Sequence, residues 1–297
     1  MKHVFVVNPK AGQGVNAADI EEKLKKTDVD WEIYVTKSRM DATRFVKERC
    51  ESGERLRFYA CGGDGTINEV ARGVIGHENA SMTCLPVGSG NDFVKCCGGR
   101  EAMLDIDALV HANEKTIDAI KVNDRHCINA CHFGFDTAVA KIMNEIRTKK
   151  IIGGKNAYTT GVIKALITNM KTKGQIYADG EKIGGDEFLL CTITNGQYVG
   201  GMFRCAPRAE LDDGWLELCY VKPVSRLTFI KLVGKYKNGE HLDDPRFKDV
   251  MVYRRCKKVE VIAGEDFAVS LDGELYSTPR FVAEIVPGSI KFAAPIF

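Results

Sequence analysis

The chain has 297 residues, of which 28% are charged and 44% are hydrophobic, and its formal net charge is +2. This length fits one large domain or two ordinary domains, and the composition is typical of a soluble globular protein. The near-neutral charge excludes a global basic signature for nucleic acid, so we expect no nucleic-acid partner. No apolar run approaches the ~18 residues that span a bilayer, and the run after Met1 is too short for a signal peptide. The eleven cysteines include no CxxC pair, which predicts reduced thiols in a cytoplasmic protein.

The chain opens with a buried strand and a turn that contains glycine. Residues 4–7 form a continuous apolar run, as expected of a parallel strand covered on both faces. The next residues are Asn8, Pro9, Lys10, Ala11, Gly12, Gln13 and Gly14, and a helical pattern follows over residues 17–24. The glycines could belong to a dinucleotide fingerprint, but the acidic residue expected after the second strand, residues 31–35, is missing. That strand ends at Thr36, whose hydroxyl could touch a nucleotide, and the turn lacks the Gly-Lys-[Ser/Thr] of a Walker loop.

The most informative stretch is the turn between the third strand and the third helix. It reads Cys61-Gly62-Gly63-Asp64-Gly65-Thr66-Ile67-Asn68-Glu69, after an alternating run over residues 56–60 and before a helical pattern over residues 67–74. Three glycines let the backbone approach a ligand closely, and the start of a helix suits a phosphate. Asp64 would repel that phosphate unless a cation lay between them, so the turn predicts a nucleotide site with Mg²⁺. The alternative is a tight turn capped by Asp64.

A third turn, Pro86-Val87-Gly88-Ser89-Gly90-Asn91-Asp92-Phe93, follows the fourth strand at residues 82–85. Three strand ends therefore carry glycines or polar side chains, and ligands of open parallel sheets lie outside the carboxyl ends of the strands. We predict that these turns form one cofactor site. Its candidate residues are Asn8, Pro9, Lys10, Ala11, Gly12, Gly14, Thr36, Gly62, Gly63, Asp64, Gly65, Thr66, Asn68, Glu69, Gly88, Ser89, Asn91 and Asp92.

The composition changes near residue 123, after which strands dominate. Asp179-Gly180 predicts a type I′ hairpin within residues 175–183, and further strands are expected at residues 188–194, 215–221, 259–263 and 267–271. This density of strands predicts an antiparallel sandwich or barrel. One helix is expected to interrupt it, with Ser225 as N-cap and with Ile230 and Val233 facing inward. We predict an α/β domain over residues 1–122, joined by about residues 284–297 if the chain returns to it, and a β-rich domain over residues 123–283.

Several polar features of the second half have both a structural and a functional interpretation. Residues 141–173 contain eight basic residues and one acidic residue, Glu145. This stretch is either a solvated face or a surface that meets anionic lipid, at ~1 kcal/mol per basic residue. Asp118 is either a solvated edge carboxylate or a metal-linked residue, and Asp136 could be a helix N-cap. The acidic turns around residues 213 and 272 could be ordinary polar turns.

Three motifs, in this order and spacing, resemble the diacylglycerol kinase catalytic-domain family. They are Asn-Pro-x-x-Gly-x-Gly from Asn8, Gly-Gly-Asp-Gly-Thr-Ile-Asn-Glu from Gly62, and Pro-x-Gly-Ser-Gly-Asn-Asp-Phe from Pro86. The family includes bacterial lipid kinases and is similar to sphingosine and ceramide kinases, while NAD kinases and 6-phosphofructokinases are more distant relatives that share the Gly-Gly-Asp-Gly-Thr turn. It usually has Thr in place of Ser89, which keeps the hydroxyl. The resemblance covers nearly the whole chain and implies a Rossmann-like, NAD-kinase-like three-layer α/β domain followed by a β-rich sandwich domain.

The resemblance also implies a reaction and roles for its residues. The reaction is transfer of the γ-phosphoryl group of ATP to a lipid hydroxyl, diacylglycerol first, with phosphatidic acid as product, at the inner face of a membrane. Asp64, Asp92 and Asp118 would serve Mg²⁺ directly or through water. In the Asp-Gly-Glu block, the implied roles are a metal-linked Asp272 and a general base, Glu274. A structural Mg²⁺ is implied in the β-rich domain, held by Asp213 and by the backbone carbonyls of Glu210 and Trp215.

Two other functions stay open at this point. One is a soluble phosphotransferase such as an NAD kinase, against which the Pro86–Phe93 block and the Asp-Gly-Glu block argue. The other is a non-catalytic nucleotide or lipid sensor, against which the retained acidic residues argue, although fold alone proves no chemistry. The sequence does not identify the lipid head group, and it leaves a homodimer open.

Overall fold

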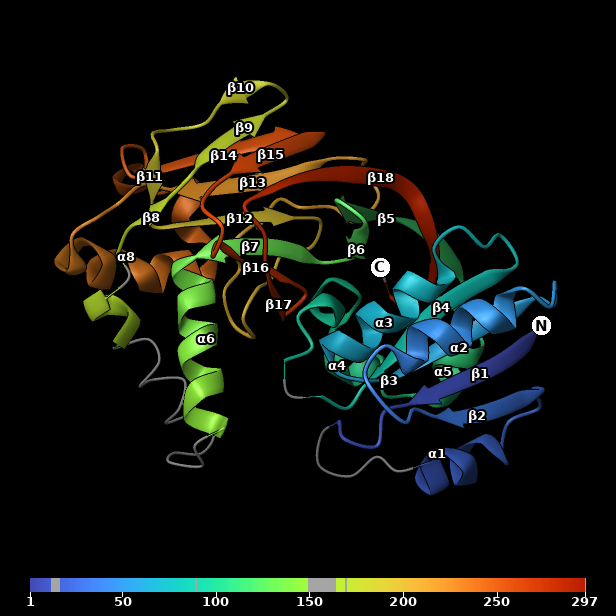
Figure 1. The fold of residues 1–297 in the computed structure, drawn as a ribbon. Helices are drawn as coiled ribbons and strands as arrows, with labels where there is room; N and C mark the ends of the chain where they lie inside the picture. Colours follow the sequence, from blue (N-terminus) through green and yellow to red (C-terminus); the bar gives the residue numbers. More distant parts are fainter. Residues whose placement is uncertain (12–16, 89, 149–163, 169, 297) are drawn as a thin grey trace.

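The computed structural model describes residues 1–11, 17–88, 90–148, 164–168 and 170–296. The chain forms two lobes, and two paired strands, β5 (Glu114–Val122) and β18 (Arg280–Ala293), run between them (Figure 1). Three predicted site residues, Gly12, Gly14 and Ser89, lie outside the described residues, and so does the central part of the basic stretch predicted at residues 141–173. Among the described helices, none is both long enough and apolar enough to cross a membrane.

The N-terminal lobe is built on a parallel sheet with the strand order β4-β3-β1-β2. Its strands are β1 (Lys2–Val7), β2 (Trp31–Val35), β3 (Leu56–Gly62) and β4 (Ala80–Pro86). The helices of this lobe are α1 (Ala17–Leu24), α2 (Asp41–Cys50), α3 (Asp64–Val74), η1 (Phe93–Cys96), α4 (Gly99–Ala102) and α5 (Ile106–Val110). Helices α2 and α3 pack closely because Gly73 has no side chain: a Cβ there would lie 2.6 Å from the Val46 side chain.

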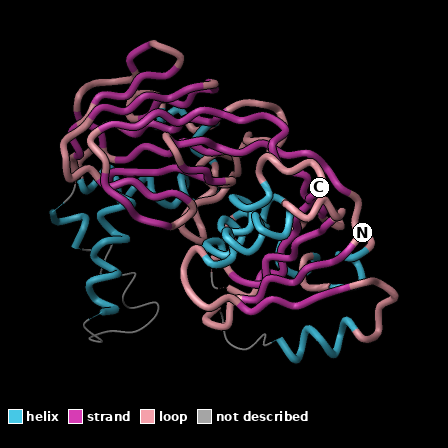
Figure 2. Tube along the Cα trace, turned by 45° about the vertical axis from the view of Figure 1, so that its right-hand side comes forward, coloured by secondary structure: helices cyan, strands magenta, loops and turns pink. Residues whose placement is uncertain are grey.

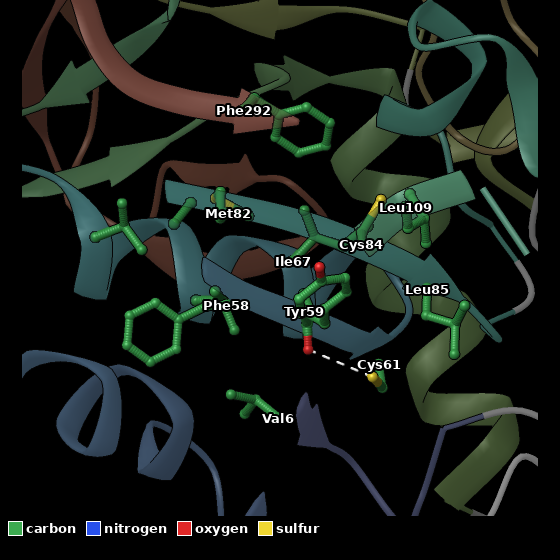
Figure 3. Close-up of a cluster of buried hydrophobic side chains, with 14 of the residues drawn as sticks. Val6, Phe58, Tyr59, Cys61, Ile67, Met82, Cys84, Leu85, Leu109 and Phe292 are labelled. Atoms are coloured by element: carbon green, nitrogen blue, oxygen red, sulfur yellow. Dashed lines mark hydrogen bonds between the residues drawn. The ribbon is translucent and has the colours of Figure 1, made fainter. Parts of the chain in front are cut away.

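The core of this lobe explains why its strands read as continuous apolar runs. Every residue of β3 and β4 is buried, because the sheet is covered on both faces. Phe5 stacks on Tyr59 with ring centroids 4.0 Å apart, and the Tyr59 hydroxyl lies 2.6 Å from Nδ1 of His3. Phe292, from the end of the chain, lies in the same cluster as Met82 (Figure 3). The lobe therefore buries side chains from both ends of the described sequence.

The C-terminal lobe is a sandwich of two sheets. One sheet is antiparallel, in the order β14-β13-β12-β7-β16-β17. Its strands are β7 (Ala130–Gly134), β12 (Leu190–Thr194), β13 (Leu216–Val221), β14 (Met251–Cys256), β16 (Ala268–Leu271) and β17 (Glu274–Ser277). The facing strands are β5 (Glu114–Val122), β6 (Arg125–Cys127), β9 (Gln175–Ala178), β10 (Glu181–Lys182), β15 (Lys258–Ile262) and β18 (Arg280–Ala293). The two layers share one core, in which Phe133 of β7 meets Phe281 of β18 edge to face, with centroids 5.5 Å apart.

The remaining elements of this lobe lie at the edges of the sandwich. Strands β8 (Thr172–Lys173) and β11 (Glu187–Phe188) form a two-stranded sheet. The helices are α6 (Phe135–Thr148), α8 (Arg226–Asn238), η2 (Glu240–Leu242) and η3 (Pro245–Phe247), with a further helical segment at residues 164–168. All eleven cysteines are free thiols.

Strand β18 belongs to both lobes. Its first half pairs antiparallel with β15, and after an irregularity between Val286 and Ile290 it pairs in parallel with β4, at Phe292 and Met82. One ten-stranded sheet therefore runs through the whole molecule (Figure 2). The segment from residue 284, which the sequence left undecided, returns to the N-terminal sheet.

Several local predictions for the second half can be compared with the structure. The Asp179-Gly180 hairpin is confirmed, because β9 and β10 pair around two residues with positive φ. The Ser225 cap is also confirmed, since its hydroxyl accepts a hydrogen bond from the Thr228 amide. The prediction that Ile230 faces inward is wrong: its side chain is 61% exposed, because no element among the described residues covers that face of α8.

Candidate active site

The turns after β3 and β4 touch each other at the carboxyl edge of the parallel sheet. The amides of Val87 and Gly88 both donate to the Gly62 carbonyl, at 3.0 and 3.2 Å. A Cβ on Gly88 would lie 2.4 Å from the Cα of Gly63, so only glycine allows this approach. Helix α3 begins here at Asp64, and a Cβ added to Gly65 would meet no atom of the described part of the chain within 4 Å. The result is an open helix start flanked by bare backbone, which suits a phosphate group.

Asp64 and Asp92 lie side by side at this edge. Oδ1 of Asp64 accepts hydrogen bonds from the amides of Asp92, at 2.7 Å, and Phe93, at 3.5 Å. Asp92 is bound by the Lys95 ammonium group at 2.7 Å and by the Gly201 amide at 2.8 Å. Burial and the negative charge of Asp92 raise the pKa of Asp64. A cation placed between these carboxylates and a phosphate would relieve that repulsion.

Asp272 approaches the same place from the C-terminal lobe. It lies in the turn between β16 and β17, where it has a φ of 46°. Its carboxylate accepts three backbone hydrogen bonds, from Ile128 at 2.8 Å, Asn129 at 3.1 Å and Ala130 at 2.8 Å. Burial raises the pKa of Asp272 to about 6, although the three hydrogen bonds act to lower it. The negative charge of Asp64 also raises this pKa. Three predicted residues, Asp64, Asp92 and Asp272, thus line one cavity of about 570 Å³.

Glu274 lies elsewhere, although only Gly273 separates it from Asp272. Its carboxylate is bound by Arg72 at 3.0 Å and by Arg39 at 3.2 Å. It lines a second cavity of about 640 Å³, whose other charged or ionisable side chains are Arg39, Lys47, Arg72, Asp124, Arg125, His126 and Tyr276. The two carboxylates of the Asp-Gly-Glu block therefore face different cavities, one largely apolar and one rich in cations.

Other predicted cofactor residues shape the turns more than they face a cavity. Asn8 donates to the Thr66 hydroxyl at 3.0 Å and accepts from the Lys10 amide at 3.0 Å. Asn91 donates to the Gly88 carbonyl at 2.7 Å and has a φ of 52°. The Thr36 hydroxyl lies 3.3 Å from the Val7 carbonyl, at the end of β1. These contacts link the three strand ends to one another.

Some of the other predicted cofactor residues of the N-terminal lobe are exposed at the surface, and some are buried. Pro9 and Lys10 are exposed, and Ala11 is half-buried. Asn68 is buried between the His126 carbonyl and Arg72, and the Glu69 carbonyl accepts a hydrogen bond from the Thr43 hydroxyl at 2.7 Å. Asn68 thus supports the contact between the lobes and does not point at the glycine turns.

Asp118 connects three segments of the chain. Its side chain is buried, and it accepts hydrogen bonds from the amides of Gly214, at 2.6 Å, and Gly288, at 2.7 Å. Gly288 belongs to the irregularity of β18, so Asp118 fastens β18 and the 213–215 loop to β5. Asp118 lines neither of the two cavities. Direct contact with a nucleotide-bound metal would need a different arrangement of these segments.

Basic side chains contact the loop in which the second-domain metal site was predicted. Asp213 is ion-paired with Arg255 and accepts a hydrogen bond from the Trp215 amide at 2.9 Å. The Lys257 ammonium group donates to the Gly214 carbonyl and lies 3.7 Å from the centre of the Trp215 ring. No three His, Cys, Asp or Glu side chains of the described residues converge as a metal cage. In this arrangement both side-chain oxygens of Asp213 are engaged, by Arg255 and by the Trp215 amide, and Lys257 occupies the neighbouring Gly214 carbonyl, which does not favour Mg²⁺ at residues 210–215. Glu210 is exposed at the surface.

The sequence did not predict the apolar part of the first cavity. Its wall comes from five separate segments: β7 with α6, the helical segment at residues 164–168, β12, the 199–205 loop, and α8. The apolar lining includes Phe135, Val139, Leu166, Leu190, Met202, Phe203, Phe229 and Val233. The sequence offered a partial signal in the helix expected after Ser225, because Ile230 and Val233 of that helix both line this cavity. One cavity thus connects the carboxylates at the sheet edge to an apolar chamber in the β-rich lobe.

The comparisons with known proteins agree with this geometry. Residues 2–122 match the diacylglycerol kinase catalytic domain, and residues 129–294 match the YegS C-terminal NAD kinase beta sandwich-like domain. The chain is 30% identical to the diacylglycerol kinase of Bacillus subtilis (strain 168) over 278 residues, which cover 91% of this chain and 88% of that protein. The chain belongs to the diacylglycerol kinase family. The family resemblance predicted from the three motifs is confirmed.

Further relatives support the same family assignment. This chain is 28% identical to a probable lipid kinase YegS-like protein of Xanthomonas oryzae pv. oryzae (strain MAFF 311018), with 96% of this chain and 94% of that protein covered. A crystal structure of a putative diacylglycerol kinase from Bacillus anthracis superposes with a TM-score of 0.73 at 26% identity, covering 99% and 96% of the two chains. An NAD kinase from Archaeoglobus fulgidus in complex with ATP superposes with a TM-score of 0.51 at 13% identity, which shows a shared fold. The predicted fold class is confirmed.

Proposed function

We propose that this chain transfers the γ-phosphoryl group of ATP to the free hydroxyl of diacylglycerol and so forms phosphatidic acid. One observation carries the proposal: Asp64, Asp92 and Asp272 share a cavity with an apolar chamber in the other lobe. A lipid hydroxyl placed at the carboxylates would leave the acyl chains among the side chains of α6 and α8. The apolar lining favours this over a fully polar acceptor, because polar groups lose hydration in such a chamber.

The nucleotide is proposed to bind on the polar side of the Asp-Gly-Glu turn. Its phosphates would meet the bare backbone at Gly63, Gly65 and Gly88 and the start of α3. The cation-rich second cavity next to Glu274 offers Arg39, Arg72 and Lys47 to further anionic or polar groups of ATP. The two cavities would thus receive the two substrates on opposite sides of residues 272–274.

Mg²⁺ fits this site at Asp64. The pKa of its carboxyl is raised by burial and by Asp92, so a nearby cation would favour the ionised form. Such an ion takes one or two carboxylates together with phosphate oxygens and water, so no preformed cage is required. When bound, it would neutralise the charge that develops on the transferred phosphoryl group.

Two residues are candidates for the group that accepts the proton of the lipid hydroxyl. The family resemblance implies Glu274, but its carboxylate is shared between Arg39 and Arg72 in the second cavity. Asp64 lines the cavity proposed for the lipid, and its ionised carboxylate can accept a hydrogen bond from the reacting hydroxyl. We therefore propose that Asp64 lies nearest the reacting hydroxyl, that Asp272 orders the amides of residues 128–130, and that Glu274 positions the two arginines.

The substrate would enter from a membrane surface. Four large hydrophobic side chains are exposed on segments that line the cavity: Ile167 at 64%, Met202 at 43%, Leu227 at 71% and Ile230 at 61%. Exposed Lys164 and Lys231 lie on the same two helical segments as Ile167 and Ile230, and Arg226 of α8 donates to the carbonyls of residues 166 and 167. Apolar side chains surrounded by cations suit the interface of an anionic bilayer, so we propose peripheral contact through this face.

The decisive experiment presents a panel of lipids and NAD to the protein with labelled ATP and Mg²⁺. We expect label in diacylglycerol and none in NAD. The Asp64→Asn variant should show no transfer while keeping its fold. Labelling of NAD in place of any lipid would overturn the proposal, and binding of ATP without transfer to any acceptor would favour a sensor.

A further inference from the structure

The apolar chamber contains a small group of polar side chains that nothing described so far uses. His132 of β7 lies directly opposite Thr192 of β12 and Ser270 of β16 in the sheet register. All three line the first cavity, and so does Asp136, one residue into α6. Nδ1 of His132 has no hydrogen-bond partner among the described residues, and the nearest carboxylate oxygen is that of Asp136, 3.9 Å away.

These polar groups are costly to the fold. His132 is only 9% exposed, and a buried polar group without a partner costs roughly 1–3 kcal/mol. The Thr192 hydroxyl has only the thiols of Cys205 and Cys219 near it, and sulfur is a weak partner. Asp136 stands among Phe135, Val139 and Phe229 in the cavity wall. Buried polar side chains are normally hydrogen-bonded, and those of His132 and Thr192 lack strong partners within the described residues. A bound ligand would supply the missing hydrogen bonds.

The protonation states of the group favour hydrogen-bond donors. Burial lowers the pKa of His132 to about 4, so the ring is neutral at pH 7 and one of its nitrogens carries a hydrogen. Burial raises the pKa of Asp136 to about 7, so its carboxyl carries a proton much of the time. His132 and Asp136 line the cavity with side chains that are 11% and 30% exposed, whereas the Thr192 hydroxyl has no surface open to the cavity. Two donors thus face the cavity.

The position of the group relative to Asp272 fits the head of a glycerolipid. Ser270 precedes Asp272 by two residues, which corresponds to roughly 7 Å along a strand. His132 and Thr192 are level with Ser270 across the sheet. If the lipid hydroxyl is held at Asp64 and Asp272, the lipid atoms a few bonds further on lie beside His132. The acyl chains then continue towards α6 and α8.

We propose that His132 and Asp136 form a subsite that holds the ester carbonyl groups of the lipid and so selects ester-linked glycerolipids over their ether-linked analogues. The inference rests on the function proposed for the same cavity. Ester carbonyls accept hydrogen bonds from both side chains, whereas an ether oxygen is a poorer acceptor. No cation of the described residues faces this group in the cavity wall, so an acidic lipid group would find no partner there.

The test compares dioleoylglycerol with its dialkyl ether analogue in detergent micelles. We expect wild-type protein to prefer the ester by about 10- to 100-fold in kcat/KM, since each lost hydrogen bond is worth ~1–3 kcal/mol. Asp136→Leu and His132→Phe should reduce this ratio towards one, mainly through KM for the ester. Asp136→Asn keeps a donor and removes the charge, so it should keep the preference. Equal use of both lipids by the wild type, or an unchanged ratio in Asp136→Leu and His132→Phe, would overturn the proposal.

Binding without ATP separates this inference from the function on which it rests. Labelled ester and ether lipids should bind the wild-type protein with the same ratio that turnover shows. If no lipid is phosphorylated but the ester still binds more tightly, the subsite stands and the proposed reaction fails. If an amine-bearing lipid binds best and Asp136→Asn abolishes that binding, the carboxylate recognises charge, and the ester subsite is refuted.

Discussion

Nη1 of Arg72 lies 3.0 Å from the Glu274 carboxylate and thereby joins helix α3 of one lobe to strand β17 of the other. The two side chains are only 10% and 16% exposed. Arg72 also donates through Nε to the His126 carbonyl at 2.8 Å. Glu274 is therefore part of a nearly buried contact between the lobes, beside the cavity proposed for ATP.

The first prediction concerns Glu274→Gln. Because Gln keeps the shape but loses the ion pair, we expect weaker ATP binding and a kcat within about tenfold of wild type. Arg39→Gln, which removes the more exposed partner, is the matched control and should give a smaller change. A kcat lower by ~10²–10⁴-fold with unchanged binding of a non-hydrolysable ATP analogue would instead assign Glu274 as the general base.

Asp64→Asn should abolish Mg²⁺-dependent phosphoryl transfer and leave the fold intact. In the wild type, the Asp92 amide donates to Oδ1 of Asp64 at 2.7 Å. The Asn side chain keeps an oxygen that accepts this hydrogen bond, but it lacks the negative charge that a metal needs. Turnover and far-UV circular dichroism measure the two parts of the prediction. Near-normal turnover in a folded variant would remove Asp64 from both the metal and the base roles.

The loop at Asp213 should depend on basic side chains and not on Mg²⁺. We expect Asp213→Ala to lower stability by about 1 kcal/mol, which corresponds to a Tm lower by ~2–4 °C. In an Asp64→Asn background, Mg²⁺ should leave the Tm unchanged, whereas Lys257→Met frees the Gly214 carbonyl and should create a Mg²⁺ effect. A rise in Tm with Mg²⁺ that Asp213→Ala removes would restore the metal site.

The pH dependence of stability should reveal Asp136. Burial raises its pKa in the folded protein from 3.8 to about 7, so the folded state holds this proton more tightly than the unfolded state. The associated stability is present below about pH 4 and is lost as the pH rises through about 7. Asp136→Asn should therefore match wild type at pH 4 and be more stable at pH 8, by an amount that solvent screening reduces because the Asp136 side chain is 30% exposed. Urea denaturation at the two pH values checks this, and an equal difference at both would contradict it.

Membrane binding should depend on the exposed face of α8. Replacing Leu227 and Ile230 by Ser removes apolar contact area and should weaken binding to anionic vesicles at least several-fold. Ile262→Ser removes an exposed apolar side chain of β15, far from α8 in sequence, and serves as control. Salt should weaken wild-type binding, because screening acts within ~8 Å at physiological ionic strength. Equal binding of all three proteins would exclude this face.

The sequence was sufficient where function depends on backbone that is local in the chain. The described strand ends with Asp64 and Asp92 follow from apolar runs and turn residues, because parallel strands bring their carboxyl ends to one edge. Asp272 lies in an antiparallel hairpin, and only the family resemblance pointed to it. The Asp-Gly-Glu block was harder. Asp272 and Gly273 both have positive φ and form the hairpin turn between β16 and β17, so Glu274 already belongs to the next strand and faces another cavity. Spacing alone does not reveal that change of direction.

The parts that were missed depend on contacts between distant segments. His132, Thr192 and Ser270 share one face only because β12 and β16 both pair with β7. Lys257 reaches the Gly214 carbonyl from 43 positions away along the chain, and a basic side chain near an acidic turn carries no signature of that contact. Ile230 looked like a core residue because an amphipathic pattern does not tell whether protein or membrane covers it.

The position of β18 has a consequence for how the protein is made. The strand that stands between β15 and β4 in the middle of the large sheet is the last strand of the chain in sequence order. While the ribosome is still synthesising residues 280–293, β4 and β5 lack this neighbour, and Phe292 is missing from the first core. The N-terminal lobe therefore cannot complete its core until residues 280–293 have left the exit tunnel, and its full protease resistance should appear only then.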